Sequence, residues 1–137
     1  MTLVLDASVI IKWLLRDRAS ESNTENATNI VEAIIKGQRS AVQPVHWLAE
    51  VAGVMSRLSP KTAETDVAML QALNLTVAED PAILPRACRL AIRLKHHLFD
   101  TLYHAVALES GATLVTADHV YLDKARSLGH ITGLDHW

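Results

Sequence analysis

A short, continuously apolar run near the N-terminus is the feature that most constrains the fold. Leu3-Val4-Leu5 contains no polar residue alternating with its apolar ones. A strand of this kind is buried on both faces, which is typical of a parallel sheet covered by helices. Because parallel strands cannot be joined by tight turns, the run also predicts helical crossovers further along the chain.

Short strands alternate with helices along the rest of the sequence. The pattern predicts strands at residues 3–5, 40–43, 75–77, 112–116 and 130–132. It predicts helices at residues 9–15, 30–35, 45–58, 62–73, 82–97, 100–110 and 118–128, with Ser8 as the N-cap of the first. Such alternation implies parallel pairing and right-handed crossovers. We therefore expect an α/β protein, a three-layer α/β/α sandwich around a short, mostly parallel sheet.

Length and composition limit the class of protein. The 137 residues fit one domain, and we expect residues 1–137 to form it. The net charge is −2, so any binding of a polyanion has to come from a local patch or from bound cations. No signal peptide and no apolar run of the roughly 18 residues that a membrane span needs is present. The single cysteine, Cys88, favours a reducing compartment, and we expect a cytoplasmic protein without membrane contacts.

Two aspartates follow expected strands. Asp6 comes directly after Leu5, and Asp118 is separated from the strand that ends at Thr116 only by Ala117. Ligands of an open parallel sheet bind beyond the carboxyl ends of the strands, so both acids are candidates for one site. The alternative is that each is an N-cap, a role worth roughly 1 kcal/mol. Asp100 also stands at a predicted helix start, and the same alternative applies to it.

Glu50 is the only charged residue between Val45 and Ser56. That helix is apolar nearly all round, which predicts that it is largely buried, and a lone carboxylate there needs a partner or a task. His46 and Arg57 share its helix face, so an ordinary hydrogen bond or ion pair is the alternative to a site.

The four acids together point to a metal ion. Two carboxylates about 5 Å apart repel by roughly 3 kcal/mol at an effective dielectric constant of 20, so a cluster has to bind protons or cations. Sites made only of oxygen ligands suit Mg²⁺ or Mn²⁺, and these ions support phosphodiester hydrolysis. Lys12 and Arg16, an i, i+4 pair near Asp6, are candidate contacts to RNA phosphates. Arg86, Arg89 and Arg93 also form one helical stripe, which Lys95, His96 and His97 follow. A solvated face is the favoured interpretation, and a contact to RNA phosphate is the alternative.

The order of these motifs resembles the PIN domain family, and most of all its VapC-type toxins. The matching stretches are Leu3 to Ser8, Glu50 on a helix after a short strand, Phe99 to Leu108, and Leu114 to Asp118. The resemblance spans nearly the whole chain and implies a parallel sheet between helices, a Mg²⁺ or Mn²⁺ site and endoribonuclease activity. It also implies a small antitoxin partner and a homodimer. His104 stands where the family has an apolar residue, and residues 17–28 have no counterpart.

By this resemblance each site residue takes a role. Asp6, Glu50, Asp100 and Asp118 match the catalytic, metal-binding acids of the family, and Ser8 and Thr116 match the hydroxyl residues that support the first and last acid. We expect a metal-dependent endoribonuclease, the toxin of a toxin–antitoxin pair. One alternative is a non-catalytic binding module with a PIN-like fold.

A second alternative is a Mg²⁺-dependent phosphoacceptor signalling domain. That class needs an adjacent acidic pair after the first strand and a lysine after the last one. Here Ala7 follows Asp6, and no lysine follows Ile131-Thr132, which counts against this class.

Overall fold

Five strands form one sheet in which every pair is parallel, as predicted. The computed structural model describes all 137 residues. The strands are β1 (Thr2–Leu5), β2 (Ser40–Gln43), β3 (Thr76–Val77), β4 (Thr113–Thr116) and β5 (Ile131–Gly133). Their order is β3-β2-β1-β4-β5, so β1 and β4 lie side by side in the middle. Signalling domains of the flavodoxin-like type have the order 2-1-3-4-5 instead, which sets the phosphoacceptor alternative aside.

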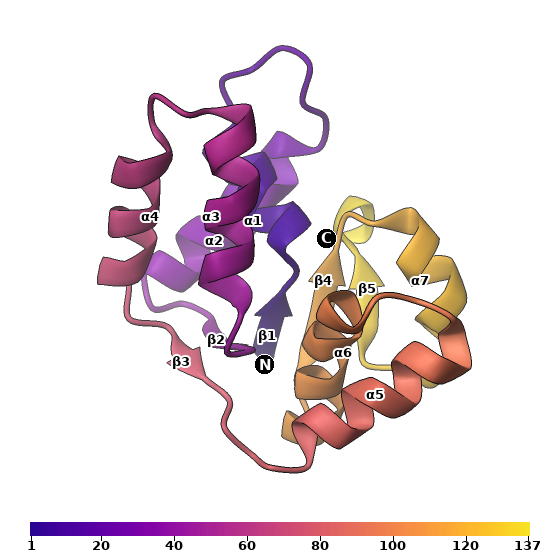
Figure 1. Ribbon diagram of the computed structural model, residues 1–137. Coiled ribbons are helices and arrows are strands. Elements are labelled where there is room, and N and C mark those ends of the chain that lie inside the picture. Colours follow the sequence, from indigo (N-terminus) through magenta and orange to yellow (C-terminus); the bar gives the residue numbers. More distant parts are fainter.

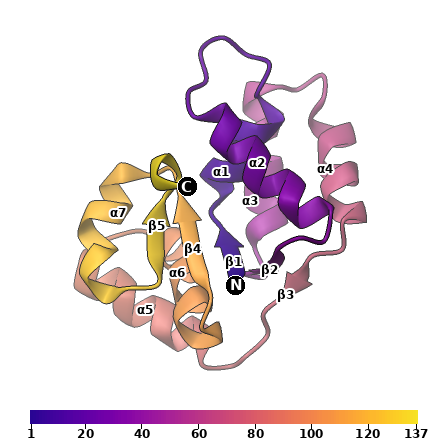
Figure 2. The ribbon, with the colours of Figure 1, turned by 180° about the vertical axis from the view of Figure 1, so that it is seen from behind.

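Helices cover the sheet on both sides, which confirms the expected sandwich. The helices are α1 (Ala7–Leu14), α2 (Thr24–Ile35), α3 (Trp47–Leu58), α4 (Ala63–Ala72), α5 (Ile83–Leu94), α6 (Leu98–Ser110) and α7 (His119–Ala125). Helix α6 packs over β1 and β4 and against α5 (Figure 1). Helix α2 lies in front when the molecule is seen from behind (Figure 2). No helix is both long and apolar enough to span a membrane.

The side chain of Gln43 completes the pairing of the short strands β1 and β2. Backbone pairing joins only Thr2 to Ser40 and Leu3 to Ala41. Beyond it, the buried amide of Gln43 accepts a hydrogen bond from Leu5 N at 2.8 Å and donates one to Leu5 O at 2.9 Å. The amide therefore replaces a strand neighbour at the residue that precedes Asp6.

The predicted boundaries differ from the structure at three places that matter for the site. Helix α1 begins at Ala7 with Asp6, rather than Ser8, as its N-cap. The helix predicted at residues 82–97 ends at Leu94, because Lys95 adopts a left-handed conformation with φ 51°. This position of a helix C-terminus usually holds glycine, so the sequence carries no common stop signal there. Helix α6 then starts at Leu98, before Asp100.

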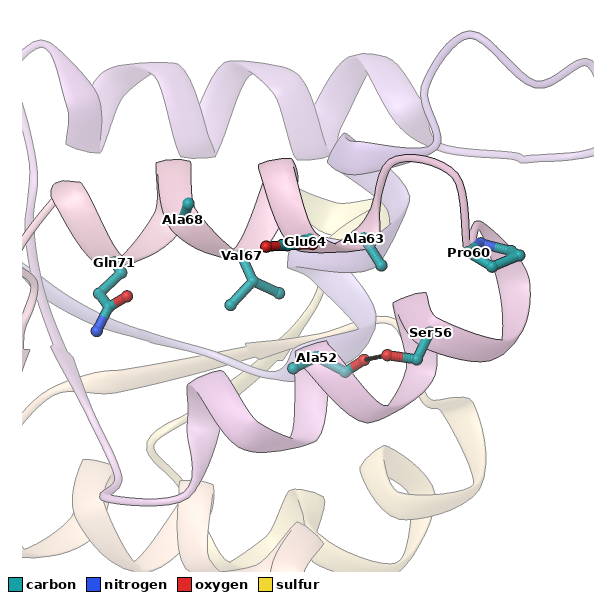
Figure 3. Close-up of a pocket in the computed structure, with 8 residues that line it drawn as sticks. All are labelled: Ala52, Ser56, Pro60, Ala63, Glu64, Val67, Ala68 and Gln71. Carbon is teal, nitrogen blue, oxygen red and sulfur yellow. Dashed lines mark hydrogen bonds between the residues drawn. The ribbon is translucent and has the colours of Figure 1, made fainter.

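Helix α3 is less buried than its composition predicts. Trp47, Val51 and Met55 face the core, whereas Ala49 and Gly53 are exposed. Beside it, a hollow of about 570 Å³ runs between α3 and α4, lined by small and apolar side chains such as Ala52, Ala63 and Val67 (Figure 3). Glu64 is the only charged residue in its lining, so this hollow carries no cluster of catalytic groups.

Candidate metal centre

The four acids lie together at the carboxyl ends of β1 and β4. Carboxylate oxygens of Asp6, Glu50 and Asp100 are all within 4.8 Å of one another. Asp100 belongs to a second group of the same size, in which one of its oxygens, one of Asp118 and a ring nitrogen of His96 are all within 4.8 Å. The topology brings them together, because β1 pairs directly with β4 and α6 packs across both strands.

Asp6 is held by two hydroxyl groups. Its Oδ2 accepts hydrogen bonds from Ser8 Oγ and, at 3.3 Å, from Thr116 Oγ1. Both hydroxyls also accept a hydrogen bond from the chain after β4: Ser8 Oγ from Ala117 N at 3.1 Å, and Thr116 Oγ1 from Asp118 N at 3.0 Å. The two side chains therefore tie the end of β1 to the end of β4 and fix one oxygen of Asp6 in place.

Asp6 and Asp118 are helix caps as well as members of the cluster. Asp6 Oδ2 accepts from Ser8 N at 3.2 Å, and Asp118 Oδ1 accepts from Tyr121 N at 3.1 Å. In both residues the other carboxylate oxygen makes no hydrogen bond to a backbone amide. Asp100 is different, because His97 is the residue at the N-cap position of α6 and the Asp100 carboxylate caps no helix. The capping alternative therefore does not account for Asp100.

Glu50 lies in the first turn of α3 and faces the other acids. Its Oε1 accepts from the hydroxyl of Tyr103 at 3.4 Å, and its Oε2 is 3.4 Å from His46 Nε2. That nitrogen is closer, at 2.8 Å, to the carbonyl oxygen of Phe99, which can only accept, so the proton on His46 points to Phe99. Glu50 Oε2 therefore does not accept the proton on that nitrogen.

Asp100 is positioned by His96, a residue that no sequence pattern marks as part of the site. His96 Nε2 is 2.8 Å from Asp100 Oδ2, and His96 Nδ1 is 3.2 Å from Lys124 Nζ. Because an ammonium group only donates, Nδ1 accepts and the proton of the neutral ring is on Nε2, where it is donated to Asp100. His96 lies in the turn between α5 and α6, so helical spacing alone would not have found it.

Burial dominates the electrostatics of the cluster, and mutual repulsion adds to it. Burial raises the pKa of Asp6 to about 6, the hydrogen bond from Ser8 opposes this rise, and the charges of Asp100 and Glu50 add to it. Burial, followed by the charge of Glu50, also raises the pKa of Tyr103 far above its usual range. Tyr103 therefore stays protonated and donates its hydrogen bond to Glu50.

The donor set fits a divalent cation. Oxygen ligands of Mg²⁺ and Ca²⁺ lie at roughly 2.0–2.6 Å, so two oxygens on one ion are at most about 5 Å apart. The spread of 4.8 Å among Asp6, Glu50 and Asp100 meets this condition. A cation between these oxygens would offset both the burial and the repulsion that raise the pKa of Asp6.

Lys12 and Arg16 make contacts within their own part of the chain. Lys12 Nζ is 3.3 Å from Glu21 Oε2 and donates to Ser22 O at 3.1 Å. Arg16 lies beyond the end of α1, donates to Trp13 O at 2.8 Å and stacks over the Trp13 ring at 5.0 Å. Neither cation reaches the acids directly in this arrangement.

His104 has a structural explanation. It is fully buried, its Nδ1 is 2.9 Å from the hydroxyl of Tyr121, and its Nε2 is 2.8 Å from Gly129 O. Burial lowers the pKa of His104, so the ring stays neutral and joins α6 to α7.

Solved structures show the same fold at low sequence identity. A toxin–antitoxin complex from Klebsiella pneumoniae is similar with a TM-score of 0.69 and 16% identity over 96% of this chain and 97% of that one. VapBC2 from Rickettsia felis, bound to a promoter DNA fragment, has a TM-score of 0.69 and 15% identity over 97% and 98%. VapC20 from Mycobacterium tuberculosis, a toxin that cleaves the sarcin–ricin loop, has a TM-score of 0.66 and 14% identity over 91% and 94%.

The family itself follows from the sequence match. No relative among functionally curated proteins matches the chain. The PIN domain profile, in contrast, matches residues 3–127, a range that contains β1, β4 and all of the clustered acids. With that match and the parallel sheet that places the acids at its centre, the chain belongs to the PIN domain family.

Proposed function

We propose that the protein is a metal-dependent endoribonuclease that hydrolyses RNA phosphodiester bonds. One observation carries the proposal: Asp6, Glu50 and Asp100, from three separate elements, converge within 4.8 Å where β1 ends. Membership of the PIN domain family supports nuclease chemistry. The description of the Mycobacterium tuberculosis relative as a toxin that cleaves the sarcin–ricin loop supports RNA as the substrate.

In this proposal the acids hold Mg²⁺ or Mn²⁺, and Asp118 completes the site beside Asp100. A bound ion of this kind polarises a phosphoryl oxygen and lowers the pKa of its water. Other side chains of the protein hold these acids in position. Ser8 and Thr116 orient Asp6, Tyr103 orients Glu50, and His96 orients Asp100. Such supporting hydrogen bonds contribute roughly 10–100-fold to metal affinity or activity.

A pair of aspartate variants tests the proposal. Asp6→Asn keeps the shape of the side chain but removes its charge, and Asp123→Asn makes the same change at a side chain that is 76% exposed on α7. With labelled single-stranded RNA and Mg²⁺ or Mn²⁺, we expect Asp6→Asn to lose at least about 100-fold in rate, since it removes a ligand rather than a supporting bond. Asp123→Asn should cleave RNA at the wild-type rate, and a chelator should stop cleavage by the wild type and by Asp123→Asn.

Two results would count against the enzyme. Wild-type cleavage by Asp6→Asn would remove the acids from the chemistry. A wild-type chain that binds RNA, folds, and cleaves none of it in either metal would favour the non-catalytic binding module.

We further propose that this nuclease is the toxin of a toxin–antitoxin pair, acts in the cytoplasm and forms a homodimer. The Klebsiella pneumoniae structure is described as a toxin–antitoxin complex, and this description supports an antitoxin as the partner of this chain. Co-expression with the product of an adjacent small reading frame tests this. We expect that protein to co-purify with the chain and to abolish RNA cleavage, and independent purification of the two would contradict the pairing.

A further inference from the structure

A hollow lined by cations lies one side chain away from the acids. It has a volume of about 470 Å³ and is lined by Ala91, Lys95, His96, His97 and Lys124. The ring of His96 forms part of this lining, and its Nε2 donates to Asp100 Oδ2 at 2.8 Å. The turn between α5 and α6 passes beside α7 at this place (Figure 1). The hollow and the acid cluster thus share one imidazole ring.

The two lysines of the hollow have no anionic partner. None of the ion pairs in the structure includes Lys95 or Lys124, although Asp100 and Asp118 are close by. Lys124 Nζ donates instead to Lys95 O at 3.2 Å and to His96 Nδ1 at 3.2 Å. Its ammonium group is therefore held at the hollow by neutral acceptors, with its charge unpaired.

Lys95 has a left-handed backbone conformation that is unfavourable for residues other than glycine. Its φ of 51° lies in the left-handed region, where the C-terminal end of a helix usually has glycine. A lysine at this point adds a charge to the hollow and gives up backbone stability. Residues held in such conformations are often found at functional sites.

The cationic surface continues along α5. A second hollow, of about 530 Å³, is lined by Arg86, Arg89 and Arg93 together with apolar side chains. Arg86 pairs with Glu109 at 2.9 Å, but Arg89 and Arg93 are exposed and in no ion pair. Because the net charge of the chain is −2, this concentration of unpaired cations on one helix is a local feature that a long polyanion would match.

We propose that the hollow formed by Lys95, His97 and Lys124 binds a backbone phosphate of the RNA strand, next to the phosphodiester held at the acids. The inference rests on the proposed nuclease function. It predicts the path of the RNA on the protein surface, which leads from the acids toward α5. Lys12, by comparison, already pairs with the carboxylate of Glu21, and Arg16 lies over the Trp13 ring and donates to Trp13 O. Lys124 has a second effect, because it keeps the proton of His96 on the nitrogen that faces Asp100.

Binding to RNA without cleavage tests the site. The Asp6→Asn variant serves as the background, in Mg²⁺, and the probe is a fluorescent single-stranded RNA of mixed sequence followed by anisotropy. Added to this background, Lys95→Gly and Lys124→Gln should each weaken binding. The double variant should reduce the magnitude of the slope of log affinity against log salt by about 0.7, the value for one phosphate contact on a single strand. Lys124→Arg keeps the charge and should keep the slope.

A matched control lies on the other side of the molecule. Lys61, in the turn between α3 and α4, is exposed and in no ion pair, so Lys61→Gln should change neither affinity nor slope. Lys95→Gly should also unfold at higher temperature than the background while it binds RNA more weakly. A residue that serves only the fold would not give these opposite signs.

The outcomes separate this inference from the nuclease function. If the background binds RNA and the Lys95→Gly, Lys124→Gln double variant has the same affinity and slope, the phosphate site is wrong and the nuclease stands. Inorganic phosphate at constant ionic strength should compete with RNA for the background, since it fits the same cationic hollow, and should compete less with the double variant. If neither the background binds RNA nor the wild type cleaves it, both proposals fail.

Discussion

At Asp6 the folded environment disfavours the negative charge that a metal ligand needs. It lies partly buried where β1 and β4 end, and two neighbouring carboxylates face it, so its charged form is disfavoured without a cation. The unshifted pKa of an aspartate is 3.8, whereas that of Asp6 in the folded chain is about 6. Between these two values the folded state binds more protons than the unfolded state. The stability of the metal-free chain therefore falls as the pH rises from about 4 to about 6.

This shift leads to a prediction for Asp6→Asn. Without divalent ions at pH 7, the variant should be more stable than the wild type by about 1–2 kcal/mol, somewhat less than the full shift implies because the bond from Ser8 weakens. The gain should disappear below about pH 4, where the wild-type carboxyl is protonated in both states. Urea unfolding across this pH range, with a chelator present, measures it.

Asp123→Asn is the control for the same titration, since its exposed side chain should leave the curve unchanged. A variant Asp6→Asn that is destabilised at every pH would show that the Ser8 and Thr116 bonds, rather than the burial of charge, decide the stability at this position.

At the scale of elements, Gln43 determines how β1 and β2 stay together. Gln43→Leu keeps the volume but leaves the N–H and C=O of Leu5 without partners inside the core. Each unsatisfied backbone group costs roughly 1–3 kcal/mol, so we expect a loss of about 2–4 kcal/mol in the free energy of unfolding. The measurement is equilibrium unfolding in urea. Gln38→Leu, at an exposed position, is the matched control, and an equal effect of both changes would contradict the assigned role.

The same scale shows what the sequence could predict. Alternating strands and helices were enough for the parallel sheet, and the position of Asp6 and Asp118 after strands was enough to place both at one edge. The apolar sequence around Glu50 predicts a largely buried helix, and this prediction is wrong in part, since Ala49 and Gly53 on that helix are exposed.

The turn between α5 and α6 was beyond prediction. Helical periodicity continues through Lys95 in the sequence. The helix ends there because Lys95 adopts a left-handed backbone conformation, and the sequence has no glycine at this position that would predict it. His96 is brought to Asp100 by this turn. The cationic hollow and the position of His96 therefore depend on one backbone conformation that sequence patterns rarely reveal.

At the scale of the molecule, apolar side chains remain exposed close to the site. Val45 is 69% exposed and Phe99 60% exposed. The two residues line neighbouring hollows, one with Leu84, which is 54% exposed, and the other with His46 and Glu50. Apolar surface of this kind, next to a charged centre, supports the proposal that the chain pairs with a second copy.

The homodimer can be tested by its mass in solution. A dimer interface of standard size buries about 1,600 Å² in total, and loss of a large apolar side chain at its centre weakens it most. We expect the wild type to sediment at twice the chain mass and the double variant Val45→Ser, Phe99→Ser to shift toward the monomer. Val120→Ser, at a valine that is 64% exposed on α7, should leave the dimer intact. A wild type that stays monomeric at high concentration, or a double variant that stays dimeric, would show that these side chains serve another contact. Metal-dependent RNA cleavage by the monomer would show that one chain holds the whole catalytic centre.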